Sequence, residues 1–128
     1  MTMKKNLKTY YHKNQFVMEL LLEEFKISET GKLTQFIEKN LNRYNYPDTI
    51  FDLKNINHID SIGIGMFLST RNIFVDHARE MVLVCPTEKV QRMFDSINME
   101  RFCKIFPSLD EAAEYFQSRK PSSPPPAP

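Results

Sequence analysis

The sequence predicts a single α/β domain with a mixed, mostly parallel sheet of about five strands, an N-terminal hairpin, and about four helices packed mainly on one face. Short apolar segments of strand length alternate with longer segments whose apolar residues recur at helical spacing. Residues 81–85 are apolar throughout, as expected of a strand buried on both faces of a parallel sheet. The repeated order of strand and helix implies parallel neighbours joined by right-handed crossovers.

Composition fits one globular domain. The chain has 128 residues, of which 41% are apolar and 26% are charged, and nothing divides it in two. We place the domain at residues 1–119. Residues 120–128 include five prolines and no large apolar side chain, so we expect a disordered, extended tail there. Such a tail is also a conceivable ligand for a proline-recognition module.

The charge balance excludes some classes of partner. Seventeen basic and sixteen acidic residues give a formal net charge of +1, so no long-range field attracts nucleic acid or an acidic membrane. No apolar run approaches the roughly 18 residues of a membrane helix, and residues 1–6 lack the apolar centre of a signal peptide. We therefore expect a cytoplasmic protein without membrane insertion, which recognises its partner through a local surface. We also expect the domain to be monomeric or weakly associating.

The first two strands are expected at residues 7–12 and 16–22, joined by a turn at residues 13–15. In the second strand, four apolar residues alternate with their neighbours: Phe16, Met18, Leu20 and Leu22. Asn14 tolerates a positive φ angle, which favours an antiparallel hairpin.

The first helix is expected to be capped by Ser28 or Thr30 and to end near Tyr44. Its apolar residues recur at i, i+3, i+4 and i+8: Leu33, Phe36, Ile37 and Leu41. Pro47 disfavours helix at the residue before it, and the chain re-enters the sheet at about Thr49.

A third strand at residues 49–53 leads through a polar exit to a helix that Asp60 or Ser61 can cap. One face of this helix is expected in the core: Gly63, Met66, Phe67, Thr70, Ile73 and Phe74. Four further apolar residues cannot all join that face: Ile62, Ile64, Leu68 and Val75. Either an apolar surface beside Ser61 is left for a partner, or the helix is buried over more than half of its circumference.

The C-terminal part continues the same order of elements. Residues 87–97 form a helix with four inward apolar residues: Val90, Met93, Phe94 and Ile97. A short strand follows at residues 102–106. Ser108 and Glu111 have capping-box spacing, and the closing helix has one apolar face, made by Leu109, Ala112, Ala113 and Phe116.

The sequence indicates no catalytic or metal-binding group. Cys85 and Cys103 fall in or beside two predicted strands, which suits reduced, buried thiols. The histidines have no partner at ligand or catalytic spacing, and His58, the one nearest to Ser61, is expected in a loop. We therefore expect no enzyme activity and no cofactor.

Ser61 is expected at the positive end of its helix, where free N–H groups favour negative charge. That position suits a phosphoacceptor. Gly63 and Gly65 cost the helix about 1 kcal/mol each relative to alanine, which suggests a first turn left bare for an approaching partner. The alternative is that Asp60 and Ser61 serve only as a helix cap.

The run Ile50-Phe51-Asp52-Leu53, followed after a spacer by Ile59-Asp60-Ser61-Ile62-Gly63-Ile64-Gly65, resembles the signature of STAS domains of the anti-sigma factor antagonist family. Residues 80–85 and 90–94 resemble the next strand and helix, and the likeness extends to about Phe116. In that family the serine after the aspartate is phosphorylated by a partner kinase, which implies that Ser61 is the phosphoacceptor. The implied partner-binding residues are Asp60, Ser61, Ile62, Gly63, Ile64 and Gly65.

Two positions depart from the family pattern. Ile62 stands where a second small hydroxyl or alanine is common, and Lys26 stands where the first-helix loop often carries an acidic residue.

The resemblance implies an anti-sigma factor antagonist in a partner-switching circuit. The unphosphorylated domain would bind an anti-sigma factor that is also an ATP-binding serine kinase, phosphorylation of Ser61 would release it, and a serine phosphatase would restore the hydroxyl. Two alternatives need the same fold. One is a non-phosphorylated docking module, such as the cytosolic subunit of a lipid transporter, and the other is a partner switch whose output is not a sigma factor.

Overall fold

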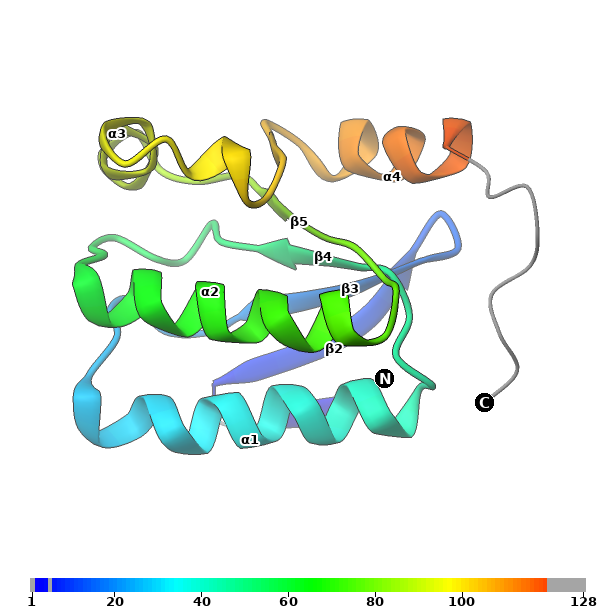
Figure 1. Cartoon of the computed structure of the whole chain (residues 1–128), viewed down its shortest axis with the longest axis horizontal. Helices are drawn as coiled ribbons and strands as arrows, with labels where there is room; N and C mark the ends of the chain where they lie inside the picture. The colour runs from blue at the N-terminus through cyan, green and yellow to red at the C-terminus, as the bar shows by residue number, and fades with distance from the viewer. Residues whose placement is uncertain (1, 5, 120–128) are drawn as a thin grey trace.

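A six-stranded sheet forms the centre of the computed structural model, which describes residues 2–4 and 6–119 (Figure 1). Its strands lie side by side in chain order: β1 (Thr2–Lys4), β2 (Leu7–His12), β3 (Gln15–Leu20), β4 (Thr49–Asp52), β5 (Met81–Val84) and β6 (Ile105–Phe106). The pairs β1–β2 and β2–β3 are antiparallel, and the other three pairs are parallel. The predicted mixed, mostly parallel sheet is confirmed. Strand β1 was not predicted, because three residues are too few to show a period.

The predicted hairpin joins β2 to β3. Lys13 and Asn14 have φ angles of 50° and 66°, and they form a two-residue turn between the paired residues His12 and Gln15. Positive φ at both turn residues matches the right-handed twist of the strands, so the turn is compatible with the hairpin even without glycine.

Four α-helices and one 3₁₀ turn are present in the described part of the chain: α1 (Ile27–Arg43), α2 (Ser61–Asp76), α3 (Glu88–Ser96), η1 (Met99–Arg101) and α4 (Leu109–Ser118). Ser108 accepts a hydrogen bond from Glu111 N, as predicted. The predicted cap of α1 is wrong, because the helix starts at Ile27 without a side-chain cap, and the Thr30 hydroxyl donates to Ile27 O instead. Phe25 is buried just upstream, so the chain is already anchored where the helix begins.

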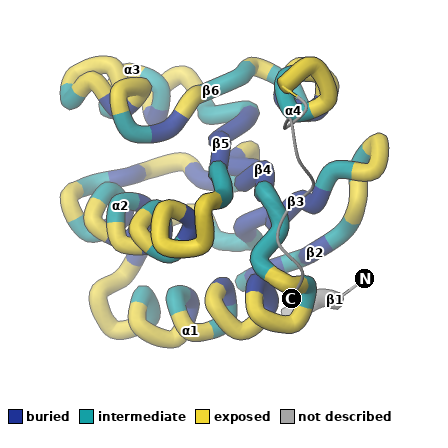
Figure 2. The backbone as a smooth tube through the Cα atoms, turned by 45° about the vertical axis from the view of Figure 1, so that its right-hand side comes forward, coloured by how far each residue is buried: buried dark blue, intermediate teal, exposed yellow. Residues whose placement is uncertain are grey.

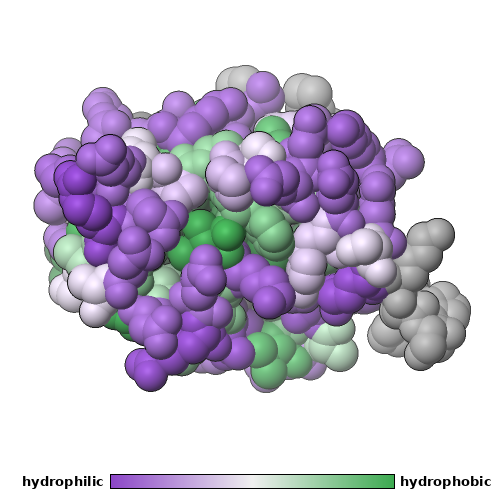
Figure 3. Space-filling model, turned by 90° about the horizontal axis from the view of Figure 1, so that it is seen from above, coloured by the Kyte–Doolittle hydropathy of each residue, from purple (hydrophilic) through white to green (hydrophobic). Residues whose placement is uncertain are grey.

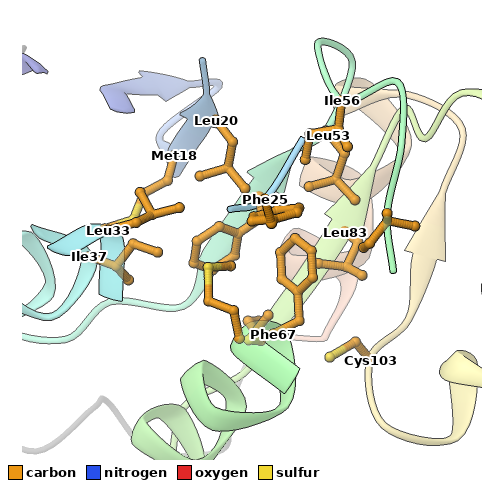
Figure 4. Packing of buried hydrophobic residues seen from close by; sticks show 14 of the residues in the cluster. Met18, Leu20, Phe25, Leu33, Ile37, Leu53, Ile56, Phe67, Leu83 and Cys103 are labelled. Carbon is orange, nitrogen blue, oxygen red and sulfur yellow. The ribbon is translucent and has the colours of Figure 1, made fainter. Parts of the chain in front are cut away.

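The two faces of the sheet carry two apolar cores. Phe16, Met18, Phe51 and Leu83 belong to the larger core under α1, α2 and α3, where the ring of Phe67 packs edge-on against that of Phe51 at a centroid distance of 6.4 Å. Figure 4 shows Met18, Leu83 and Phe67 among the side chains of this core. The residues that alternate with them form a smaller core with Ala112 of α4: Val17, Ile50, Val82 and Val84. Figure 2 shows these strands as the buried layer between the helices. Helices therefore lie mainly on one face, with α4 alone on the other.

The C-terminal strand is shorter than predicted. Residues 102–104 are not in β6, because η1 and the bend after it occupy the preceding segment. Cys103 is buried beside the strand, whereas Cys85 lies just beyond β5 with a φ angle of 58° and is only half-buried. Both cysteines are free thiols.

The edge strand β6 lies between α3 and α4, where apolar side chains reach the surface (Figure 3). A hollow of about 460 Å³ beside it is lined by Cys85, Pro86, Ile105, Phe106 and Pro107, with charged residues of α3 at its rim. Strand β6 has two residues and is followed by Pro107, so it offers little backbone for pairing with another chain. None of the described helices is long and apolar enough to span a membrane. The predicted tail at residues 120–128 lies outside the described residues.

Candidate functional site

The start of α2 is built by Asp60. This residue has an extended backbone (φ −132°, ψ −165°), and its Oδ1 accepts a hydrogen bond from Ile62 N at 3.0 Å. Its carbonyl oxygen accepts the first bond of the helix, from Ile64 N at 3.0 Å. Of the two predicted caps, Asp60 is therefore the one that forms, which leaves the Ser61 side chain free for another role.

Ser61 is the first residue of α2 and is exposed. Within the described part of the chain, its hydroxyl has no hydrogen-bond partner. The hydroxyl thus lies at the positive end of a 16-residue helix, open to solvent and unoccupied by an internal bond. This geometry suits a hydroxyl group that becomes negatively charged by modification.

Gly63 and Gly65 face different surroundings. A Cβ atom at Gly63 would lie 2.5 Å from Phe25 Cδ2 and 2.8 Å from Ile59 Cγ1, so the core requires glycine there. A Cβ atom at Gly65 would meet nothing within 4 Å. The expectation of a turn left bare for a partner therefore has support at Gly65, whereas packing explains Gly63.

A groove runs between α1 and α2, which lie next to each other on the same face of the sheet (Figure 1). Its volume is about 360 Å³, and no charged residue lines it: Thr30, Gly31, Thr34, Ile62, Gly65, Met66 and Ser69. A Cβ atom at Gly31 would also meet nothing within 4 Å. Two of the three glycines of the chain thus widen one uncharged groove that begins at Ile62, the residue after Ser61.

Four apolar residues of α2 lie outside its predicted core face. The sequence explained them either by a partner-binding surface or by a helix buried over more than half of its circumference, and the structure supports each explanation in part. Ile62, Ile64 and Leu68 are half-buried and pack against the core, whereas Val75 is 54% exposed. Near the start of α1, Ile27 is 79% exposed. Most of the surplus therefore belongs to a widely buried helix, and the apolar surface close to Ser61 is small.

The first-helix loop carries charge of both signs. Lys26, the departure from the family pattern, is the N-cap residue of α1 and lines a shallow hollow with Glu23, Glu24 and Glu29. The loop thus remains acidic around this lysine.

A buried group of charges, which the sequence analysis missed, lies where β3 and β4 end. Asp52 is fully buried, Glu19 is 8% exposed, and Lys54 Nζ lies 3.6 Å from Asp52 Oδ2 and 3.8 Å from Glu19 Oε2. Burial raises the pKa of Asp52, although the nearby Lys54 opposes this effect. Burial, together with the negative charges of Asp52 and Glu19, raises the pKa of Tyr10 to about 12. Glu19 lies at an ordinary position of an alternating strand, so the sequence gives no signal for this cluster.

The structure places five of the six implied partner-binding residues at or near one surface and buries the sixth, Gly63. Among the described residues, no group of three or more His, Cys, Asp or Glu side chains is arranged to hold a metal ion.

Comparison with known proteins identifies the fold. The sequence model of the STAS domain matches residues 7–112. A Thermotoga neapolitana protein, provisionally named an anti-sigma factor antagonist homolog, is 26% identical over 101 residues, which cover 79% of this chain and 85% of that protein. A solved Thermotoga maritima structure, also provisionally named an anti-sigma factor antagonist, has a TM-score of 0.74 at 20% identity, over 87% of this chain and 94% of that one.

Two forms of the Bacillus protein SpoIIAA share the fold. The unphosphorylated anti-sigma factor antagonist gives a TM-score of 0.70 at 15% identity, over 90% of this chain and 99% of that one. The phosphorylated form gives 0.62 at 14% identity, over 85% and 97%. Because the family match spans most of the chain and the sheet has the expected arrangement, this protein belongs to the STAS domain family.

Proposed function

We propose that this domain is an anti-sigma factor antagonist that acts as a partner switch controlled by phosphorylation of Ser61. The observation that supports this proposal best is the exposed, unbonded Ser61 hydroxyl at the first position of α2, directly after the capping Asp60. The unphosphorylated domain binds, in the cytoplasm, an anti-sigma factor that is also a serine kinase. A serine phosphatase later restores the hydroxyl.

The chemical step belongs to the kinase, which binds ATP. Ser61 Oγ attacks the γ-phosphorus, the bond from that phosphorus to the bridging oxygen of ADP breaks, and the hydroxyl proton passes to a base of the kinase. This domain binds no cofactor and acts as a binding module that presents the acceptor. A phosphate at a helix N-terminus is stabilised by about 0.3–1 kcal/mol when exposed, so we expect the fold to persist after phosphorylation.

Phosphorylation of Ser61 should weaken partner binding much more than it affects folding. The surface proposed for contact consists of the α2 start without the buried Gly63, namely Asp60, Ser61, Ile62, Ile64 and Gly65, and of the uncharged groove beside it. Phosphorylation adds about −1.5 to −2 charges next to the carboxylate of Asp60. Covering that charge with a surface shaped for a hydroxyl costs several kcal/mol in repulsion and desolvation, and each 1.4 kcal/mol lowers affinity tenfold.

The test begins with co-purification of the partner kinase, followed by incubation of the isolated domain with that kinase and ATP. Wild type should gain the mass of one phosphoryl group and Ser61→Ala none. Ser96→Ala is the matched control, because Ser96 is an exposed serine at the end of α3 and does not line the groove. Ser61→Asp should lose partner binding, and Ser61→Ala should keep it. If wild type gains no phosphoryl group, a docking module without phosphorylation becomes the better explanation.

A further inference from the structure

We propose that Asn55, assisted by Asn57, is a positioning residue for phosphorylation of Ser61. This inference rests on the proposed function. It concerns residues 53–60, which connect β4 to α2 and contain neither glycine nor proline. Three apolar residues anchor this connection in the core, with exposed fractions of 0% for Leu53 and Ile56 and 4% for Ile59. The polar residues between these anchors hold the connection to neighbouring segments.

Asn55 makes the inner attachment. Its amide Nδ2 donates to Glu19 Oε2 at 2.9 Å and to Leu20 O at 3.0 Å, so one side chain binds both the side chain and the backbone at the end of β3. Lys54 Nζ lies 3.8 Å from the same Glu19 oxygen, beyond hydrogen-bonding distance. Asn55 is therefore the closer donor to a carboxylate that is 8% exposed, and loss of the amide would leave that buried charge poorly compensated.

Asn57 makes the outer attachment. Its backbone N–H and that of His58 both donate to Glu23 O, at 2.8 and 3.2 Å, and its Nδ2 donates to Glu23 Oε1 at 2.9 Å. From the opposite side, the Thr87 hydroxyl donates to Ile56 O at 3.3 Å. The connection is thus held between the segment that leads into α1 and the N-cap of α3.

These attachments matter because the Ser61 hydroxyl has no internal bond of its own. Its position depends on the Asp60 cap and on the path of the connection before it. Phosphoryl transfer requires the attacking oxygen about 3–3.5 Å from phosphorus and in line with the leaving group, and a misplacement of about 1 Å can cost a hundredfold in rate. Asn55 contacts neither kinase nor nucleotide, and it acts through the geometry of Ser61.

The test compares variants under steady-state phosphorylation by the co-purified kinase. We expect Asn55→Ala to lower kcat by about tenfold to a hundredfold while KM for the domain changes by less than about threefold, because the docking surface remains. Glu19→Gln retains an oxygen acceptor for Asn55 and should stay close to wild type, whereas Glu19→Leu should resemble Asn55→Ala. Asn40→Ala is the matched control, since Asn40 is 6% exposed and its amide donates to Phe36 O within α1.

Two kinetic outcomes overturn the inference. One is a wild-type kcat for Asn55→Ala, and the other is a loss of kcat in Asn40→Ala that matches the loss in Asn55→Ala at equal loss of stability. A second measurement needs no kinase. Amide hydrogen exchange at residues 54–61 should accelerate in Asn55→Ala, whereas exchange in β3, β4 and β5 stays slow, and unchanged exchange at residues 54–61 also overturns the inference. Absence of phosphorylation in wild type contradicts the proposed function instead, and the exchange experiment then still decides whether Asn55 holds the connection.

Discussion

Substitution of Gly63 and of Gly65 by alanine should change stability in opposite directions. The two positions lie two residues apart in α2, so both gain the same helix propensity, about 1 kcal/mol. At Gly65 the new methyl group enters open space, and we expect a net gain of about 0.5–1 kcal/mol. At Gly63 it would lie 2.5 Å from the Phe25 ring, which is 5% exposed and packs edge-on against Phe67 at a centroid distance of 5.6 Å.

The ring of Phe25 cannot move aside without displacing Phe67. Overpacking of this kind costs about 1–3 kcal/mol, and with two contacts shorter than 3.0 Å we expect a cost above the gain in propensity. We expect Gly63→Ala to unfold at lower temperature than wild type, and Gly65→Ala to unfold roughly 2–4 °C higher.

Thermal and urea unfolding, followed by far-ultraviolet circular dichroism, measure both changes. A decrease in stability for Gly65→Ala as large as that for Gly63→Ala would refute the distinction between a glycine required by the core and one that the core does not require. Binding of the co-purified kinase provides the second measurement. A methyl group in the groove should weaken binding by Gly65→Ala although the fold is more stable, and this combination is not expected of a merely structural position.

Three further predictions concern other parts of the molecule. Burial raises the pKa of Asp52 above its usual 3.8, so the stabilisation that its proton provides is complete below pH 3.8 and is lost as the pH rises through the higher folded value. Asp52→Asn should therefore gain stability relative to wild type in urea at pH 7 but not at pH 3, and equal differences at both pH values would contradict this. Burial raises the pKa of the Cys103 thiol to about 11, and its side chain is 2% exposed, so a thiol reagent should modify one cysteine, Cys85, in the native protein and both in denaturant. A chain that ends at Lys120 should keep the melting temperature of the full chain, and a loss of several degrees would show that the tail is docked.

The sequence predicted the elements whose cause is local. Asp60 precedes an apolar helix, and its carboxylate caps that helix as its position suggests. Asn14 supplies a positive φ angle in a turn between two alternating segments, and the hairpin forms there. In both cases the deciding interaction spans only a few residues.

Features with a distant cause could not be predicted in this way. Gly63 is explained by the ring of Phe25, which arrives from another part of the chain, and the same buried ring precedes the unexpected start of α1 at Ile27. Glu19 is buried because Asn55 and Lys54 reach it from the end of the neighbouring strand. Periodicity assigns such residues to a face of an element but does not reveal what lies opposite them.

The surroundings of Ser61 explain how a large change in charge can alter binding while the fold persists. Below the helix start, the contact of Gly63 with Phe25 fixes the distance between α2 and the core. Before it, Asp60 closes the first turn, and Asn55 and Asn57 attach the connection to neighbouring segments. These groups stabilise the position of Ser61 without bonding to its hydroxyl, so a phosphate there would displace no internal partner. The charge repulsion and the desolvation of the phosphate would therefore weaken the binding of a partner that covers the start of α2, and they would leave the fold intact. A switch that releases a partner requires this difference.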